Sequence, residues 1–189
     1  MINKQDFSKI RSNLEKYDKK REELIKKSRD VLRLSKQLIY SIHRGNTKEI
    51  LGILSNLKKE KIAVDKIASS EKNLFNEGAY SEAMQEYVEA IAYLEITKKN
   101  KLPLSSTLKV SDGDYLMGIC DLTGELTRKA VTIAHKDKKQ VEKIKGIVED
   151  IFGEFLKFNL RNGNLRKKSD SIKWNLKKLE EVMYDIKKR

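Results

Sequence analysis

A single proline in 189 residues, Pro103, leaves this chain with almost no obstacle to long helices. Its nine glycines are scattered, so short strands joined by tight turns would lack the turn residues that they need. Apolar residues instead recur at helical spacing over long stretches. The sequence therefore predicts an all-α protein, built as a bundle of helices in one domain that spans residues 1–189.

The helical spacing predicts consecutive helices over residues 4–44, 47–69, 80–98, 114–135, 138–160 and 165–189. Gly45 is expected to end the first helix, because glycine is a common helix terminator. On the second helix, Ile50, Leu57 and Ile62 are among the residues expected to face inward. Residues 99–113 contain Pro103 and show no helical period, so they are expected to form the one long connection.

The charge of the chain is strongly basic. It carries 41 lysines and arginines against 28 acids, which gives a net charge of +13 and predicts attraction to polyanions, above all nucleic acid. The only cysteine, Cys120, lies in an apolar run, so it is expected to be a core residue, and it excludes a multi-cysteine zinc site. We find no stretch with the apolar length of a signal peptide or a membrane span, and we expect a cytoplasmic protein without a membrane partner.

Two pairs of carboxylates lie inside helical segments that are otherwise apolar. Glu86 and Glu89 are the only charged residues between positions 83 and 94, and Asp121 and Glu125 are the only ones between positions 115 and 127. Spacings of three and four residues place each pair on one face of a helix. A carboxylate withdrawn from water is costly unless something compensates its charge. In this chain that compensation is either a basic side chain or a divalent metal ion.

Both kinds of compensation stay open at this point. Basic side chains of a neighbouring helix would make the acids structural ion pairs. Carboxylate oxygens without nitrogen or sulfur ligands suit Mg²⁺ or Mn²⁺, and such an ion could assist attack on a phosphate. A di-iron bundle is excluded, because neither His43 nor His135 has a glutamate three residues before it. An all-α nucleotide pyrophosphohydrolase, which also uses Glu-x-x-Glu on one helix and paired acids on another, remains an alternative.

Basic residues form a stripe along the first predicted helix, with an aromatic residue among them. Either this stripe is a solvated helix face, or it supplies phosphate contacts and a stacking surface for a single strand. Arg128 follows the second acid pair and could either neutralise it or hold the strand. The residues that we expect to contact nucleic acid are Arg29, Arg33, Lys36, His43, Arg44 and Arg128.

Four segments of the chain resemble the translin family, which comprises translin and translin-associated factor X (TRAX). In the predicted first helix, KYDKKREELIKKSRDVLRLSKQLIYSIHRG is similar to the family's N-terminal signature. QEYVEA at 85–90 and DYLMGICDLTGEL at 114–126 are similar to TRAX, the subunit that carries nuclease activity. NLRNGNLRKKSDSIKWNLKKLEEVMYDI at 159–186 is more similar to translin itself. This mixture resembles a single-subunit, archaeal-type member of the family.

The resemblance implies an all-α fold of seven helices that assembles into an octameric shell. It also implies a Mg²⁺- or Mn²⁺-dependent endoribonuclease that binds and cleaves single-stranded RNA and also binds single-stranded DNA. Glu86, Glu89 and Asp121 match the family's catalytic acids, and Glu125 is a further candidate metal ligand. Because translin itself largely lacks these acids, we expect an active homo-octamer. A non-catalytic nucleic-acid-binding shell and the pyrophosphohydrolase are the alternatives.

Overall fold

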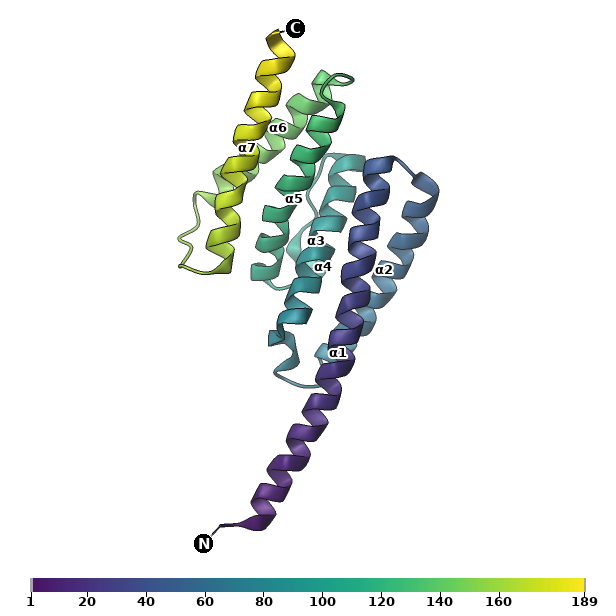
Figure 1. Cartoon of the computed structure of the whole chain (residues 1–189), viewed down its shortest axis with the longest axis vertical. Helices are drawn as coiled ribbons and strands as arrows, with labels where there is room; N and C mark the ends of the chain where they lie inside the picture. Colours follow the sequence, from purple (N-terminus) through teal and green to yellow (C-terminus); the bar gives the residue numbers. More distant parts are fainter. Residues whose placement is uncertain (1, 189) are drawn as a thin grey trace. The chain divides into compact units, whose positions relative to one another are not determined.

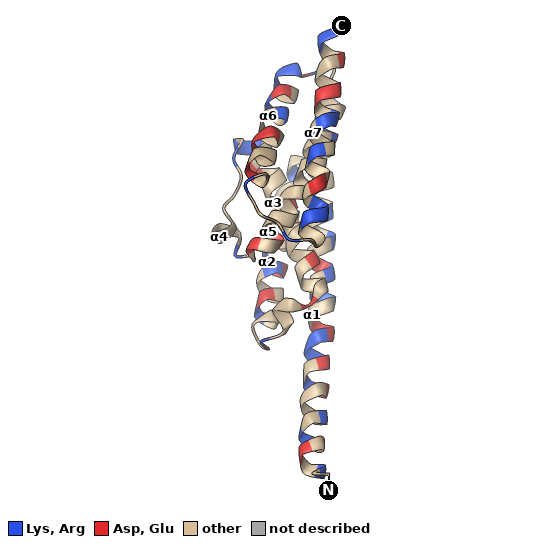
Figure 2. Cartoon of the chain, turned by 90° about the vertical axis from the view of Figure 1, so that its left-hand side faces the viewer, with Lys and Arg blue, Asp and Glu red and all other residues tan. Residues whose placement is uncertain are grey.

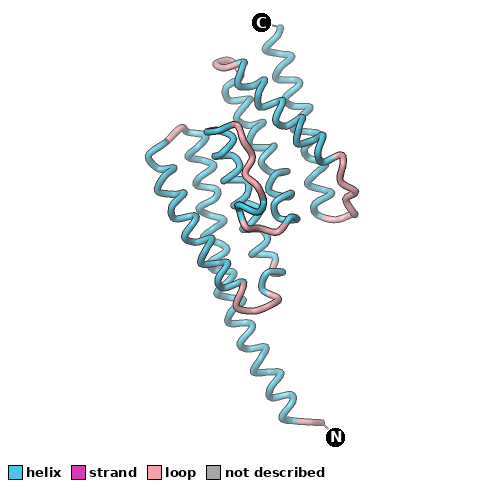
Figure 3. Tube along the Cα trace, turned by 180° about the vertical axis from the view of Figure 1, so that it is seen from behind, coloured by secondary structure: helices cyan, strands magenta, loops and turns pink. Residues whose placement is uncertain are grey.

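The computed structural model describes residues 2–188, and over this range it contains helices, turns and loops but no strand (Figure 3). The all-α prediction is confirmed, and so is the family's number of seven α-helices within the described range. A short 3₁₀ turn, η1, lies between the second and third of them. In chain order (Figure 1) the elements are α1 Lys4–Arg44, α2 Thr47–Ala68, η1 Leu74–Asn76, α3 Gly78–Lys99, α4 Ser105–Leu108, α5 Asp112–Ile133, α6 Lys138–Phe155 and α7 Asn164–Lys188.

The chain divides into two compact units, and the division falls inside α3. The first unit ends at Tyr87 and holds α1, α2, η1 and the beginning of α3. The second begins at Val88 and holds the rest of α3 with α4, α5, α6 and α7. The expectation of one domain over the whole chain stays a prediction. Within residues 2–188, no helix has both the length and the apolar character that crossing a membrane requires.

In the first unit α2 packs along α1, and the turn between them forms where the sequence predicts it. Gly45 ends α1 in the left-handed conformation at φ 68°, which glycine adopts without steric cost. Its N–H donates to the carbonyl of Ile42 at 3.1 Å. At the other end of α1, the side chain of Asn3 accepts hydrogen bonds from the backbone N–H groups of Gln5 and Asp6.

The inward face of α2 differs from the prediction at one turn. Ile50 and Leu57 are buried as expected, but Ile62 is 70% exposed. The neighbouring Lys61 is only 5% exposed and takes the inward place. Its ammonium donates to Asp65 at 2.5 Å and lies 5.9 Å from the centre of the Tyr87 ring. A buried charge is tolerable here because both partners compensate it.

In the second unit α5, α6 and α7 pack on one another. Ser111 begins α5: its hydroxyl accepts the N–H of Asp114 and donates to the Asp114 carboxylate at 2.7 Å. Between α5 and α7, the amide of Asn175 donates to the hydroxyl of the buried Thr123 at 2.8 Å. The bond between Asn175 and Thr123 joins α5, which carries the second acid pair, to the last helix.

The second unit differs from the prediction at several boundaries: α5 begins and ends two residues earlier than expected, and two differences are larger. The expected connection contains the four-residue helix α4, which turns Leu108 inward to a buried position. The fifth predicted helix ends at Phe155 instead of position 160. There Phe158 folds back and its ring meets that of Phe155 edge to face, with 5.8 Å between the ring centres.

Glu77, immediately before α3, connects the start of α3 to α1. The hydroxyl of Tyr17 donates to one of its carboxylate oxygens at 2.7 Å, and Nε of Arg21 donates to the other at 2.9 Å. The hydrogen bond from Tyr17, together with that from Arg21, lowers the pKa of Glu77 below its ordinary 4.5, although burial opposes the shift. The charged form of Glu77 therefore stabilises the first unit.

We expect Glu77→Gln to lower the free energy of unfolding at neutral pH, because the carboxylate that accepts both bonds is lost. Since the folded pKa is lowered, the stabilisation is present above the ordinary carboxyl pKa and is lost as the pH falls through the folded value. Urea midpoints of the variant and the parent protein should therefore converge in acid. Glu71→Gln, at an exposed loop position, is the matched control. Equal midpoints for both variants at neutral pH would contradict the role of Glu77.

Candidate nucleic-acid and metal site

Glu86 and Glu89 lie one turn apart on α3. Glu86 belongs to the first unit, where the ammonium of Lys36 on α1 lies 3.5 Å from its carboxylate. Glu89 belongs to the second unit and is only 8% exposed. An acid this deeply buried needs compensation, as the sequence predicts. Of the first acid pair, Glu86 therefore already has a lysine of α1 beside it.

Asp121 and Glu125 lie one turn apart on α5, and each has a basic neighbour. Lys168, near the start of α7, donates to the carboxylate of Asp121. Arg128, one turn further along α5, lies 3.5 Å from the carboxylate of Glu125. Both acids keep part of their surface in contact with solvent. The ion pairs that the structural interpretation of the acids requires are thus present.

Tyr93 shows how α3 faces α5 inside the second unit. It is fully buried, and this burial raises the pKa of its hydroxyl, with the nearby charge of Glu125 acting in the same direction and that of Arg128 opposing it. Tyr93 lies one turn after Glu89 on α3, so the two side chains share a helix face. The side of α3 that carries Glu89 is therefore turned toward the region of α5 that carries Glu125.

The donor set of these four acids suits a hard divalent cation, because all its ligand atoms are carboxylate oxygens. Across residues 2–188, however, no three histidine, cysteine, aspartate or glutamate side chains gather closely enough to hold a metal ion. The lysine on Asp121 occupies one direction from which an ion could approach. The Mg²⁺ or Mn²⁺ site at Glu86, Glu89, Asp121 and Glu125 stays a prediction.

The predicted nucleic-acid residues divide between the two units. Five of them lie on α1 in the first unit, where Arg29, Arg33, Lys36 and Arg44 are exposed and His43 is half-buried. Arg128 lies on α5 in the second unit. Positions of Lys and Arg recur along α1 in Figure 2, with Asp and Glu positions between them. We call the exposed stripe of Arg29, Arg33, Lys36 and Arg44 the basic face of α1, and its role in binding stays a prediction.

An exposed aromatic ring lies inside this basic face. Tyr40 is 54% exposed, and its hydroxyl accepts a hydrogen bond from Arg44 at 2.8 Å. The guanidinium of Arg44 also lies 5.5 Å from the centre of the ring. A flat ring with a cation beside it offers a surface on which a base can stack.

The sequence reasoning missed Lys168, the residue that meets Asp121. The available signal was the basic run Arg166-Lys167-Lys168 at the start of the last helix. Nothing in that run distinguishes the lysine that turns toward α5 from its neighbours. The choice depends on how α7 packs on α5.

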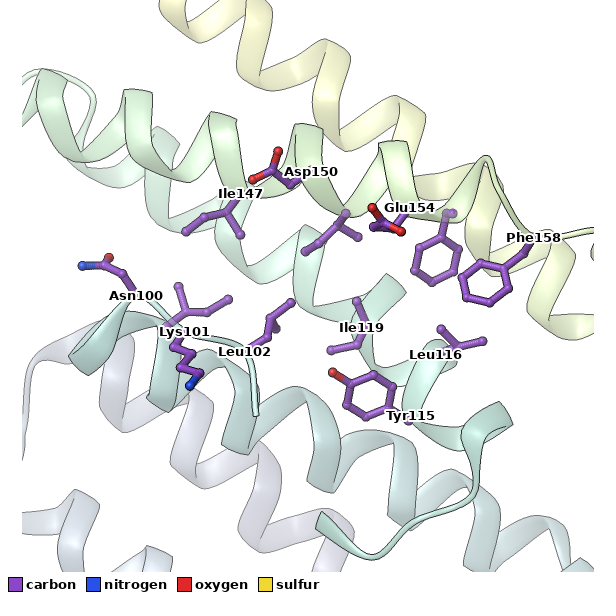
Figure 4. A pocket seen from close by; sticks show the side chains of 13 residues that line it. Asn100, Lys101, Leu102, Tyr115, Leu116, Ile119, Ile147, Asp150, Glu154 and Phe158 are labelled. Atoms are coloured by element: carbon purple, nitrogen blue, oxygen red, sulfur yellow. The ribbon is translucent and has the colours of Figure 1, made fainter. Parts of the chain in front are cut away.

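A separate cavity of about 480 Å³ lies in the second unit, between the end of α3, α5 and α6 (Figure 4). Its walls are mainly apolar, with Ile119 on α5 and Ile147 on α6 among them. Asp150 and Glu154 of α6 are its acidic members. No residue of the predicted site lines this cavity, so it is not part of the acid constellation.

The sequence model of the Translin family matches residues 19–189. The chain belongs to the translin family. An uncharacterised protein of Methanocaldococcus jannaschii is 30% identical over 166 residues, which is 85% of this chain and 73% of that protein. Translin of Gallus gallus is 38% identical over 74 residues, 39% of this chain and 32% of translin. The translin-associated protein X homolog of Schizosaccharomyces pombe is 26% identical over 146 residues, 70% of this chain and 63% of that protein.

The matches to these last two relatives thus cover less than two thirds of their length. Among solved structures, apo-NeC3PO aligns with a TM-score of 0.87 at 27% identity, over 98% of both chains. AfC3PO in its complex with duplex RNA aligns with a TM-score of 0.79 at 26% identity, over 96% of both chains. The translin-type fold that the sequence resemblance implies is therefore confirmed.

Cys120, next to Asp121, is expected to be chemically inert in this translin-family protein. Burial, aided by the charge of Asp121, raises the pKa of its thiol to about 12. At mildly alkaline pH we expect a thiol reagent to label the folded protein on the order of a thousandfold more slowly than the urea-unfolded protein, because the thiolate is the reactive form. Cys120 is the only cysteine, so the absorbance of the released chromophore reports on it alone. Rapid labelling in buffer would show that α5 is not packed as described.

Proposed function

We propose that this protein is a homo-oligomeric, metal-dependent endoribonuclease that binds and cleaves single-stranded RNA, and that it also binds single-stranded DNA. The proposal draws on the structural likeness to AfC3PO, which has been solved in complex with duplex RNA. It also draws on the net charge of +13 and on the retained acids of both helices. By the same resemblance we propose a homo-octameric shell.

One contact carries the proposal: Lys36 belongs to the exposed basic face of α1 and also lies 3.5 Å from Glu86. A strand whose phosphates follow Arg29, Arg33 and Lys36 would reach the carboxylate of Glu86 without leaving this face. Tyr40 would stack on a base of the same strand. The basic face and the first acid pair would thus act on one substrate.

Glu86, Glu89, Asp121 and Glu125 would hold the ion. When bound, Mg²⁺ or Mn²⁺ would lower the pKa of a water molecule and offset the charge that develops on the phosphate. The burial of Glu89 excludes water around its carboxylate, which strengthens its attraction for a cation. Lys36 and Arg128 can each exchange a carboxylate for a phosphate oxygen, because both side chains are more than half exposed.

A non-catalytic nucleic-acid-binding shell is the second candidate. The ion pairs Lys168–Asp121 and Arg128–Glu125 favour it, because they compensate the second acid pair without a metal. The pyrophosphohydrolase has less support, since the translin match extends over residues 19–189. Unlike the two nucleic-acid-binding candidates, a pyrophosphohydrolase would turn over nucleoside triphosphates, and RNA would not change the rate of that reaction.

We expect Glu89→Gln to abolish metal-dependent cleavage of labelled single-stranded RNA, lowering the rate at least about a hundredfold, because a buried ligand to the ion is lost. RNA affinity should change little, since Glu89 lies away from the surface. Cleavage is followed on a denaturing gel with Mg²⁺, with Mn²⁺ and with a chelator, and affinity by fluorescence anisotropy.

Glu95→Gln is the matched control. Glu95 lies on the same helix but on another face, where it pairs with Lys99 at 2.9 Å, and we expect this variant to cleave at the parent rate. If the parent protein binds RNA and leaves it intact under every condition, the non-catalytic shell is the correct interpretation. If Glu89→Gln protein that is free of contaminating ribonuclease still cleaves RNA, the acids of α3 do not take part in the reaction.

Arg33→Ala should weaken the binding of single-stranded RNA and flatten its dependence on salt. Each phosphate contact to a single strand contributes about 0.7 to the slope of log K against log salt concentration. Losing one contact should therefore reduce the slope by about that amount. Lys59→Ala, at an exposed position of α2, removes the same charge away from the stripe and is the control. Identical slopes for both variants would remove the α1 stripe from the binding surface.

A further inference from the structure

The first half of α1 carries a row of exposed apolar side chains. We call residues 4–21 the α1 arm. Along it Phe7, Ile10 and Leu14 are 60%, 48% and 59% exposed, and the half-buried Tyr17 follows. Their spacing of three and four residues places them on one helix face. Large apolar side chains in a contiguous row mark an interaction surface more often than a solvated one.

The same row continues, without a change of phase, into the core of the first unit. From Phe7 to Ile42 it follows a seven-residue repeat, and from Leu24 onward every residue at its first and fourth positions is buried. Those buried residues are Leu24, Ser28, Val31, Ser35, Leu38 and Ile42. The arm as far as Leu14 is therefore the uncovered end of a seam that other helices cover elsewhere, whereas Tyr17 and Arg21 at its inner end contact Glu77.

Among the described elements of its own unit, none lies beside the first turns of α1 in the views of Figures 1 and 3. The arm is nevertheless a formed helix, because it continues a segment that packing already holds. The cost of nucleating a helix therefore does not oppose its pairing with a partner.

We propose that the α1 arms of two copies of this chain pair side by side in opposite directions, as a short antiparallel coiled coil. In this register Phe7 lies opposite Tyr17 of the other copy, and Ile10 lies opposite Leu14. The inference rests on the homo-oligomer of the proposed function, but not on its chemistry. Such an interface is self-complementary, as twofold assembly requires.

The charges that flank the seam identify a second copy as the partner. In the antiparallel register Asp6 of one arm meets Lys20 of the other, and Lys4 meets Asp18, so that each attractive pair occurs twice. Charges at these flanking positions set partner choice and orientation in coiled coils. One like pair remains at the centre, where Arg11 faces its own copy.

A parallel arrangement fits the chain less well. It would place the two copies of Arg21 against each other inside the seam. It would also bring both packed first units to the same end of the helix pair, where they would compete for space. The antiparallel arrangement sends them to opposite ends.

Asn13 provides a direct test, because it flanks the centre of the seam and lies next to its own copy only when the arms are antiparallel. We expect Asn13→Cys in the full-length protein to be cross-linked into a covalent dimer by a short bismaleimide. Lys9→Cys, on the outer side of the same helix, should remain monomeric on a denaturing gel. Absence of the Asn13 cross-link in an oligomeric protein overturns the inference.

Solution mass provides a second test. Leu14→Glu buries a charge in the seam, so we expect the weight-average mass from light scattering to fall by about half, as the loss of one twofold interface predicts. Ser12→Glu adds the same charge on the outer face and should leave the mass unchanged. Circular dichroism checks that Leu14→Glu keeps its helices; if it does not, the cross-link at Asn13 decides.

Exchanging charges tests the direction of pairing. Asp6→Lys should weaken the assembly, because it places two lysines together. Adding Lys20→Asp should restore it only in the antiparallel register, where these positions meet. If the double variant stays dissociated, the antiparallel register is wrong.

The failures of the two proposals are distinguishable. If the parent protein is a monomer, both the homo-oligomer and the arm pairing are wrong. If the protein is an oligomer, its mass is unchanged by Leu14→Glu and Asn13→Cys does not cross-link, then only the arm pairing is wrong. Loss of RNA cleavage with an unchanged mass concerns the nuclease alone.

Discussion

Carboxylates placed among buried apolar side chains need cations from elsewhere in the chain, and this constraint organises the candidate site. Glu86 on α3 has Lys36 of α1 beside it, and Asp121 on α5 has Lys168 of α7. Each contact joins helices that are far apart in sequence. The acids therefore favour one tertiary arrangement within their own unit. They also give the chain carboxylates that can bind cations.

The same constraint explains why a basic chain can support two kinds of chemistry. Lys36 is a counter-charge for Glu86 and also a member of the exposed basic face of α1. In the function that we propose, this side chain would be released to a phosphate when RNA binds, which would leave its carboxylate available to a cation. The excess of lysines thus gives the chain a surface that attracts polyanions, and it also supplies the cations that lie beside its carboxylates.

The core was predictable where local periodicity and packing agree, and unpredictable where a long polar side chain could turn inward. Leu57 is buried as its spacing predicts. One turn later Lys61 rather than Ile62 faces inward, because Asp65 and Tyr87 are in place to receive an ammonium. The predicted helix end at position 160 was also wrong: α6 ends at Phe155, and the ring of Phe158 meets that of Phe155 edge to face.

The sequence by itself determined that the chain is helical, where α1 ends, and that each acid pair shares a helix face, because all three follow from local geometry and from a glycine at Gly45. It also indicated the family, whose match extends over residues 19–189. Only the tertiary structure decided that Lys168, and not its neighbours in the same basic run, meets Asp121. These partners lie 47 residues apart, and their contact depends on the rotation and depth at which α7 packs against α5, which no local pattern encodes.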